Sequence, residues 1–476
     1  MVLRRLAPVS VLFAGLSLSA CAIGPDYRRP PVDVGATFKE ADGWTLAAPS
    51  DALDKGQWWT VFNDPVLNDL EAQVEVSNQN LAAAEAAFSQ AKALVEENQA
   101  SFFPQVSGTA DASRAKSRSV STGGPSVSQV SNNYSLGGSA TWDIDVWGRI
   151  RREVESARDQ AKASEADIAN AKLSAQISMA NDYLALREQD EAKRLLDQSI
   201  AGYAKTLEIT RNKFNAGVAA QSDVLTAQTT LQTAQAQAVD IVRTRAALEH
   251  AIAVLEGKPP SKVSIAALPT FNLVAPQVPV GVPSTLLERR PDVAAAERVM
   301  AAANAQIGVN LAGFFPDLSL NGADGVSNSV LSRLFNASSN TWSIGAGLTQ
   351  TVFDAGLTQG KVRAAKAVYN EDVATYRQTV LTALQQVEDA IAAERVLQSE
   401  EQLRLQASKE ADQAEQITTN QYSAGTIDYT ALVVAQATAL SARETAVQTT
   451  LARLQNAVNL ISALGGGWQP TKDKMG

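Results

Sequence analysis

Residues 81–104 read LAAAEAAFSQAKALVEENQASFFP, and residues 293–316 read VAAAERVMAAANAQIGVNLAGFFP, with the same Phe-Phe-Pro ending. A second pair of segments matches at nearly the same separation: KFNAGVAAQSDVLTAQ at 213–228 and QYSAGTIDYTALVVAQ at 421–436. A self-match at a near-constant separation indicates one structural unit that occurs twice in the chain. We therefore expect two copies of one fold, in which the elements of one copy predict those of the other.

A period of two residues follows each Phe-Phe-Pro segment. Between Tyr134 and Val146 the even positions carry apolar or small side chains, and the odd positions carry Ser, Thr, Gly or Asp. The same alternation occurs at 104–114 and, in the second copy, at 342–352. It predicts strands that separate two unlike environments, and a loop rich in Ser, Asn and Gly joins the strands of each copy. The expected β-hairpins lie within residues 102–146 and 314–354.

The strands have the length and polarity of membrane-spanning strands, which run about 9–11 residues with apolar side chains toward lipid and polar ones toward a lumen. A soluble sheet with one buried face would show the same alternation, so both interpretations stay open at this point. Four strands do not close a barrel, since spanning barrels begin at about eight strands, and an open edge in lipid leaves backbone groups unpaired. If these strands span a membrane, several chains must contribute to one barrel.

Two long stretches predict unusually long helices. Residues 149–212 contain no proline and a single glycine, and residues 361–422 contain neither, while both are rich in Ala, Gln, Glu, Arg and Leu. A helix over 149–212 would be roughly 96 Å long at 1.5 Å per residue. Apolar and small residues recur in a seven-residue rhythm from Val154 onward, which is a coiled-coil spacing with a narrow seam. The long helices therefore pack side by side rather than inside a small globule.

Each long helix is expected to end at a glycine and to turn back into a second helix. Gly217 and Gly425 suit the residue after the helix end, where the backbone takes a left-handed conformation. Ser222 or Asp223, and Asp428, are the expected N-caps of the outgoing helices. Helical patterns also precede each hairpin, at 65–101 and 291–312.

Each copy is therefore a helix, a hairpin, a very long helix, a turn and a helix. Proline-rich segments outside the copies are expected to pack against the helices as a belt. The expected order is a signal peptide at 1–20, a tether and part of the belt at 21–64, the first copy at 65–257, a connection and belt at 258–290, the second copy at 291–464, and a tail at 465–476.

The composition excludes several classes of site. The chain has one cysteine, Cys21, and one histidine, His250, so it has neither an internal disulfide nor a Cys/His zinc cluster, and most nucleophile–histidine arrangements are absent as well. His250 lies in a helical stretch, where a packing or surface role is expected. The formal net charge of −9 argues against nucleic acid as a partner. It fits a lumen that favours cations over anions.

The N-terminus has the parts of a secretory signal: Arg4 and Arg5, an apolar run too short to span a bilayer of about 30 Å, and then small residues. Leu18-Ser19-Ala20-Cys21 resembles the lipobox of bacterial lipoproteins, which implies cleavage before Cys21 and acylation of that residue. Ala22, in place of Asp, implies sorting to the outer membrane. The alternative is an ordinary signal peptide followed by an incidental cysteine.

Taken together, these motifs resemble the TolC-like outer-membrane factor family, in its NodT-type lipoprotein branch. The resemblance covers nearly the whole chain and depends on motifs that occur in order. They are Cys21 with Gly24-Pro25-Asp26-Tyr27, the run from Trp58 to Pro65, the two Phe-Phe-Pro segments, Glu288 to Asp292, and the paired Ala-Gly turns.

The resemblance implies a mixed α and β fold in a homotrimer, with a 12-strand transmembrane β-barrel continuous with a 12-helix periplasmic α-barrel. It implies a bacterial outer-membrane, lipid-anchored protein that extends into the periplasm. Such a protein is no enzyme and carries no cofactor beyond lipid on Cys21. It is the exit duct of a tripartite efflux system for small toxic molecules or drugs, with a periplasmic adaptor and an inner-membrane transporter as partners, in contact with outer-membrane lipid.

The resemblance also assigns roles to particular residues. Asp223 matches a pore-facing aspartate, whereas Thr430 and Val434 stand where relatives carry a leucine and an aspartate, so a ring of Val434 would be apolar. As a helix N-terminal acid, Asp223 would also be favoured by the helix dipole. The residues of the adaptor-contact turns are Ala216, Gly217, Val218, Ala424, Gly425 and Thr426.

Other functions remain open at this stage. Within the family, the duct could serve type I polypeptide secretion or metal-ion efflux. A periplasmic coiled-coil adaptor lipoprotein would explain the helices and Cys21, but not four alternating strands placed symmetrically in two copies. A lipoprotein enzyme would need convergent acids or metal ligands that the sequence does not offer.

Overall fold

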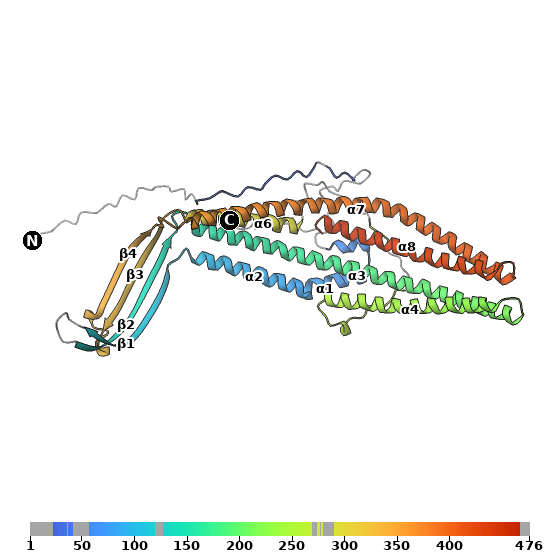
Figure 1. The fold of residues 1–476 in the computed structure, drawn as a ribbon, viewed down its shortest axis with the longest axis horizontal. Helices are drawn as coiled ribbons and strands as arrows, with labels where there is room; N and C mark the ends of the chain where they lie inside the picture. The colour runs from blue at the N-terminus through green and yellow to red at the C-terminus, as the bar shows by residue number, and fades with distance from the viewer. Residues whose placement is uncertain are drawn as a thin grey trace, which may run out of the picture. The chain divides into compact units, whose positions relative to one another are not determined.

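The structure is a computed structural model of the 476-residue chain (Figure 1). It describes residues 22–35, 37–40, 57–119, 127–268, 274–276, 278 and 290–466. The chain forms two compact units, and each unit takes pieces from both copies of the repeat. The described residues of the first unit lie within 22–29, 91–161 and 299–372, and the second unit holds the others. The two copies therefore interleave instead of forming two separate domains.

The first unit contains a four-stranded antiparallel sheet in the order β1-β2-β3-β4 (Figure 1). Its strands are β1 (Gln105–Ser119), β2 (Val127–Ile144), β3 (Asp317–Asn328) and β4 (Asn340–Thr349). The strands pair as one hairpin from each copy, and the hairpins join where Leu136 of β2 lies opposite Val326 of β3. The even-numbered residues of all four strands share one face, which carries the apolar side chains. Several of them are exposed to solvent: Trp342 is 72% exposed, Ile344 84% and Leu348 70%.

The repeated Phe-Phe-Pro segments anchor the hairpins. The Trp142 indole N–H donates to the carbonyl oxygen of Phe102 at 2.9 Å, and the Trp147 indole N–H donates to that of Pro316 at 2.8 Å. The Trp147 ring also stacks on Phe315, with 4.9 Å between ring centroids. Aromatic side chains with one polar atom suit such a boundary between apolar and polar surroundings.

An aspartate caps the helix that follows each hairpin. The Asp145 carboxylate accepts the backbone N–H groups of Ile150 and Arg151 at the start of α3 (Arg149–Asn215). The Asp354 carboxylate accepts those of Gly356 and Thr358 at the start of α7 (Leu357–Ala424). These bonds satisfy donors that a helix N-terminus leaves without partners. The Thr358 side chain, together with the backbone N–H groups of Thr358 and Gly356, holds the pKa of Asp354 down at about 2.

The remaining helices follow the expected order with one difference. The residues 65–101 form two helices, α1 (Pro65–Ser77) and α2 (Gln79–Ala100), and not one. The break lies at Asn78, whose side-chain oxygen accepts the N–H groups of Asn80 and Leu81 and so caps α2. The Asn78 amide also donates to the carbonyl oxygen of Leu255 at 2.8 Å, which satisfies the end of α4 (Gln221–Leu255). The other long elements are α6 (Pro291–Ala312) and α8 (Tyr429–Ala463).

The largest core of the second unit lies where belt segments meet the helices. Trp58 and Trp59, in a short 3-10 helix (Trp58–Phe62), are buried, and Ile265 and Val278 of the connection join the same cluster. Val380, Val387 and Ile391 of α7 are also buried. Within the described residues, no helix combines the length and apolarity needed to cross a membrane. No group of three or more His, Cys, Asp or Glu side chains able to hold a metal ion occurs in this part of the chain.

Residues 22–26, expected as part of a tether, are packed within the first unit. The Ile23 N–H donates to the Trp147 carbonyl oxygen at 3.0 Å, and the Asp26 carboxylate pairs with Arg152 at 2.9 Å. A Cβ on Gly148 would lie 2.6 Å from the Cα of Ala22. The chain directly after Cys21 is therefore held at the junction between β2 and α3. The expected signal peptide, Cys21 and the tail from residue 467 lie outside the described residues.

Candidate functional site at the helical turns

The turn between α3 and α4 ends the long helix with a pair of characteristic hydrogen bonds. The N–H of Gly217 donates to the carbonyl oxygen of Phe214 at 2.9 Å, and that of Val218 donates to Lys213 at 2.8 Å. This is the Schellman pattern, and Gly217 takes the left-handed backbone conformation it requires, with φ of 74°. The expected role of Gly217 at the helix end is confirmed. Ala216, Gly217 and Val218 are all exposed.

The turn between α7 and α8 repeats the same geometry. Gly425 donates to Tyr422 and Thr426 donates to Gln421, both at 3.0 Å, and the φ of Gly425 is 78°. Ala424, Gly425 and Thr426 are exposed. The sequence repeat therefore extends to individual backbone hydrogen bonds, and both turns present bare backbone to solvent.

The starts of the outgoing helices differ between the copies. Asp428 is the N-cap of α8, as expected, and its carboxylate accepts the N–H of Ala431 at 2.9 Å. In the first copy the expectation is wrong, since Ala220 occupies the cap position and Ser222 lies inside the helix. Asp223 is the third helical residue, and its carboxylate accepts the N–H of Ala220 at 3.3 Å. This bond places the Asp223 charge at the positive end of the helix dipole, where it is favoured.

A small core joins the two turns. Leu207, Ala227, Tyr422, Tyr429 and Leu432 are buried together just behind the turns. The Tyr422 hydroxyl lies 2.9 Å from the Thr210 hydroxyl, and the rings of Tyr422 and Tyr429 meet edge to face at 5.6 Å. Burial raises the pKa of Tyr429 to about 12, so its hydroxyl stays neutral.

Lys213 adds a second link between the turns. Its ammonium group lies 3.9 Å from the centre of the Tyr422 ring and donates to the Tyr422 carbonyl oxygen. A cation over an aromatic ring contributes about 0.5–1 kcal/mol at an exposed site. The sequence did not predict the contact between Lys213 and Tyr422, because two matching segments can be recognised without any sign that they touch. The signal available was that Tyr422 and Phe214, one in each copy, are both aromatic.

The three candidate constriction residues occupy two helix starts. Thr430 and Val434 lie one helical turn apart on α8, both exposed, and Val434 is 60% exposed. Asp223 is partly buried at the start of α4. The described contacts hold Asp223 to its own helix start, so its side chain is oriented before any partner arrives.

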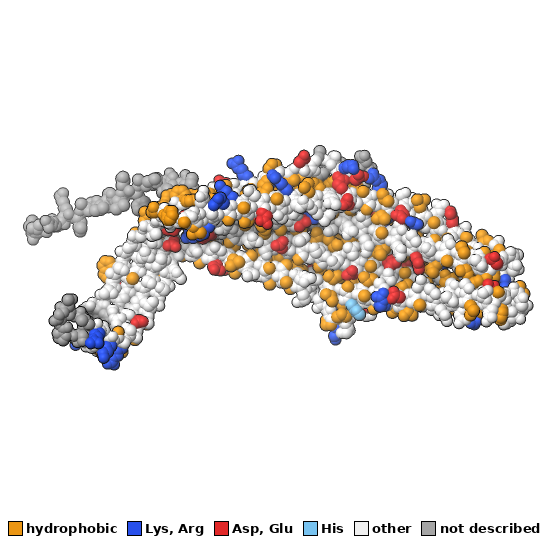
Figure 2. Space-filling view, viewed as in Figure 1, with side chains coloured by type: hydrophobic (Ala, Val, Ile, Leu, Met, Phe, Trp, Pro, Cys, Tyr) orange, Lys and Arg blue, Asp and Glu red, His pale blue; other side chains and the backbone are white. Residues whose placement is uncertain are grey.

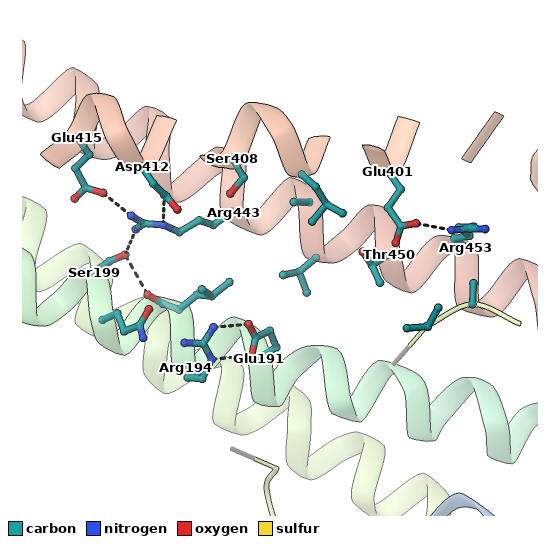
Figure 3. Close-up of a pocket in the computed structure, with 17 residues that line it drawn as sticks. Glu191, Arg194, Ser199, Glu401, Ser408, Asp412, Glu415, Arg443, Thr450 and Arg453 are labelled. Atoms are coloured by element: carbon teal, nitrogen blue, oxygen red, sulfur yellow. Dashed lines mark hydrogen bonds and ion pairs between the residues drawn. The ribbon is translucent and has the colours of Figure 1, made fainter. Parts of the chain in front are cut away.

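Arginine clamps tie α8 to α7 further from the turns. Arg443 contacts Asp412 at 2.7 Å and Glu415 at 2.6 Å (Figure 3). Arg453 contacts Glu394 at 2.9 Å and Glu401 at 2.7 Å. All of these side chains except Glu394 line a cavity of about 890 Å³ between α3, α7 and α8.

An arginine at the equivalent position of the first copy also pairs with an acid of the preceding long helix. Arg245 of α4 contacts Asp190 of α3 at 2.6 Å, and it stands in α4 where Arg453 stands in α8. Because these side chains are largely shielded from solvent, the pairs are screened less than surface ion pairs. The clamps therefore set the register of each helix pair that carries a turn.

A duplicated unit of long paired helices with a β-hairpin is an architecture that the chain shares with an outer-membrane channel of known structure. The sequence model of the outer membrane efflux protein family matches residues 71–257 and 282–466, and the chain belongs to this family. The chain is therefore an outer-membrane channel protein of an efflux pump, and its place is the outer membrane, from which it extends into the periplasm.

Individual relatives agree over almost the full length. The chain is 32% identical to the pyoverdine export outer membrane protein OpmQ of Pseudomonas aeruginosa, over 97% of each chain. It is 30% identical to the toluene efflux pump outer membrane protein TtgC of Pseudomonas putida, over 97% of this chain and 95% of the relative. The structure of the outer-membrane channel OprN matches with a TM-score of 0.86 at 30% identity, over 94% of this chain and 100% of OprN. These relatives are channel and pump components.

Proposed function

We propose that three copies of this chain form the exit duct of a tripartite pump that exports small organic molecules. In this assembly the four-stranded sheets of three chains join edge to edge into one 12-strand barrel, and the long helices continue it as a 12-helix tunnel. The observation that carries the proposal is the sheet itself. Its apolar face is exposed, and β1 and β4 each have one edge that pairs with no strand of the described chain. Lipid would cover the apolar face, and strands of the other two chains would supply hydrogen-bond partners for the two unpaired edges.

The substrate class is inferred from the relatives and not from a pocket. OpmQ is named for pyoverdine export and TtgC for toluene efflux, and both relatives cover nearly the whole chain. A duct needs no pocket that fits its cargo, because discrimination falls to the pump that feeds it. Small organic molecules are therefore the proposed cargo, delivered by an inner-membrane transporter through a periplasmic adaptor.

The two turns are the proposed contact for the adaptor. They present exposed backbone at Gly217 and Gly425, and the cluster of Tyr422 and Tyr429 holds them together. Rigid, exposed turns can bind a partner without a large ordering cost. Asp223, Thr430 and Val434, which follow the turns, are the proposed constriction, with Val434 as an apolar ring.

Cys21 is the proposed site of the lipid anchor. Residues 22 and 23 are held at the junction of β2 and α3, beside the end of the apolar sheet face. An acyl chain on the preceding residue would thus begin at the level where the strands leave the bilayer. The anchor would add membrane affinity to that of the barrel.

The decisive experiment measures assembly and environment together. The purified chain in detergent should have the mass of three copies by light scattering, and planar bilayers should show conductance that favours cations. A bimane label on a cysteine at Leu136 or Leu348, on the apolar face, should show the fluorescence spectrum of an apolar environment, as among lipid acyl chains. A cysteine at Ser135, on the opposite face, is the matched control and should emit as in water. A monodisperse monomer, or water at all three labels, would refute the duct.

A further inference from the structure

The apolar face of the sheet continues into a row of cations at the end of β1. Arg114, Lys116 and Arg118 occupy alternate positions, so they share the face that carries Val106 and Ala110 lower on the same strand. All three side chains are exposed. Successive members of the row are about 6.8 Å apart along the strand. Figure 2 shows Lys and Arg side chains gathered at this end of the sheet.

The strand register places this row just past the apolar band. Leu136 of β2 lies opposite Ala110, and Tyr134 lies opposite Ala112. The next position of β1 on the same face is Arg114, opposite Asn132. Tyrosine marks the interface between the hydrocarbon and the polar layer in membrane proteins. The cations thus begin one step beyond an interfacial aromatic side chain.

Among the described strand residues, the positions opposite Arg114 and Lys116 carry no acid. Arg114, Lys116 and Arg118 face Asn132, Val130 and Ser128, which are all uncharged. Asp111 and Asp143 are on the opposite face because they hold odd positions. Asp324 shares the apolar face, but the register places it level with Gly138, about 20 Å from the Arg114 level, and it accepts a hydrogen bond from Asn340. In a chain with a net charge of −9, a basic edge without acids indicates an anionic ligand.

The position of the row on β1 indicates which leaflet of the outer membrane the cations face. Both helices that flank this hairpin, α2 and α3, join its other end, since α2 ends at Ala100 and α3 begins at Arg149. Because the protein extends into the periplasm through its helices, the end of β1 at Ser119 points to the outer leaflet. That leaflet consists of phosphorylated glycolipid, whose phosphate groups lie at the level just beyond the hydrocarbon.

We propose that Arg114 and Lys116, with Arg118, bind the phosphate groups of the outer-leaflet glycolipid on the outside of the duct. The proposal rests on the proposed function, because it needs the apolar face to lie in the outer membrane. Guanidinium and ammonium groups bind phosphate through charge-assisted hydrogen bonds, and the cation spacing allows two phosphates of one lipid to be held at once. The row thereby fixes the height of the sheet in the membrane and takes the place of divalent cations between neighbouring glycolipids.

The test uses the full-length chain in detergent, titrated with bisphosphorylated lipid A and followed by native mass spectrometry. Each cation next to an anionic lipid surface contributes about 1 kcal/mol, so R114S/K116S should bind about 30-fold more weakly. The charge-preserving R114K/K116R should bind as the wild type does. The matched control R377S/K409S, which removes two exposed cations from α7, should also leave binding unchanged.

Other ligands identify the source of the affinity. Dephosphorylated lipid A, phosphatidylglycerol and inorganic phosphate should each bind the wild type far more weakly than bisphosphorylated lipid A. Equal binding by any of them, or unchanged binding by R114S/K116S, overturns the proposal. Conductance measured on the same preparations distinguishes failure of the lipid-binding proposal from failure of the proposed duct. A conducting trimer without lipid A preference overturns only the lipid-binding proposal. A wild type that neither assembles nor conducts overturns the duct.

Discussion

Three glycines with the same backbone conformation should respond very differently to the same substitution. Gly217, Gly425 and Gly257 each end a helix with a φ of 74°, 78° and 66°. A Cβ at Gly217 or Gly425 would meet no atom within 4 Å, whereas a Cβ at Gly257 would lie 2.0 Å from the carbonyl oxygen of Ser77. The alanine variants therefore separate the cost of the backbone conformation from the cost of a steric clash.

The magnitudes follow from these contacts. An alanine in the left-handed conformation costs about 1–2 kcal/mol, and this is the whole effect expected for Gly217→Ala and Gly425→Ala. Gly257→Ala must also displace the junction of α1 and α2. That junction donates to α4 through the Ser77 hydroxyl, 2.5 Å from the Glu256 carbonyl oxygen, and through Asn78. Losing both hydrogen bonds adds about 1 kcal/mol each, so the total is about 3–4 kcal/mol.

Amide hydrogen exchange at the helix ends measures these costs locally. The last turns of α3 and α7 should exchange about 5- to 30-fold faster in Gly217→Ala and Gly425→Ala. The last turn of α4 should exchange roughly 150- to 1,000-fold faster in Gly257→Ala, and the start of α2 should lose protection with it. Gly202→Ala, in the middle of α3 with open space around it, is the control and should not accelerate exchange. Equal acceleration at all three glycines would refute the steric argument.

Three further predictions concern the turns, a buried acid and a clamp. Gly425→Val should impair drug export in a susceptibility assay while it lowers the melting temperature only slightly, because the valine side chain covers the proposed adaptor contact. Export at the wild-type level would show that this turn does not contact the adaptor. Glu71 is fully buried with no hydrogen-bond partner, and burial raises its pKa to about 9. The folded protein keeps this proton while the unfolded chain loses it above about pH 4.5, so stability should fall by up to about 1.4 kcal/mol per pH unit between about pH 5 and 9. Glu71→Gln should flatten that slope in thermal unfolding, exposed Glu85→Gln should keep it, and equal slopes would contradict the buried-acid assignment. Arg453→Gln should lower stability by about 2 kcal/mol and speed exchange in α8, because it leaves two shielded glutamates without their cation; an unchanged exchange pattern would show that the clamp does not hold α8.

Much of the local structure could be read from the sequence because it depends on neighbours in the chain. The alternation at 134–146, the absence of proline from 149–212 and the glycines at 217 and 425 each act within a few residues, and the hairpin, the long helix and the turns formed as expected. Because the unit is duplicated, the same motif predicted the same element in both copies. Family membership followed from the same local motifs taken in order.

Two of the three errors arose where a distant segment decides the outcome, and the third, at Ala220, arose from a residue three positions further along. The helix expected at 65–101 breaks at Asn78 because this side chain serves the end of α4, which lies far away in the sequence. Ala220 became a cap in spite of its apolar side chain because Asp223 supplies the hydrogen bond from inside the helix. Residues 22–26 packed against the first unit because Gly24 and Gly308 approach so closely that a Cβ on Gly24 would lie 2.6 Å from the Gly308 Cα.

The sequence by itself determined the periods, the repeat and the positions where helices stop, because backbone sterics and side-chain periodicity are local properties. Only the tertiary structure decided which segments meet. It brought Lys213 and Thr210 of one copy onto Tyr422 of the other, and it set the strand register that places Arg114 one step beyond Tyr134. Contacts of this kind depend on how whole helices pack and how strands pair, so they cannot be predicted from the residues adjacent to a side chain in the sequence.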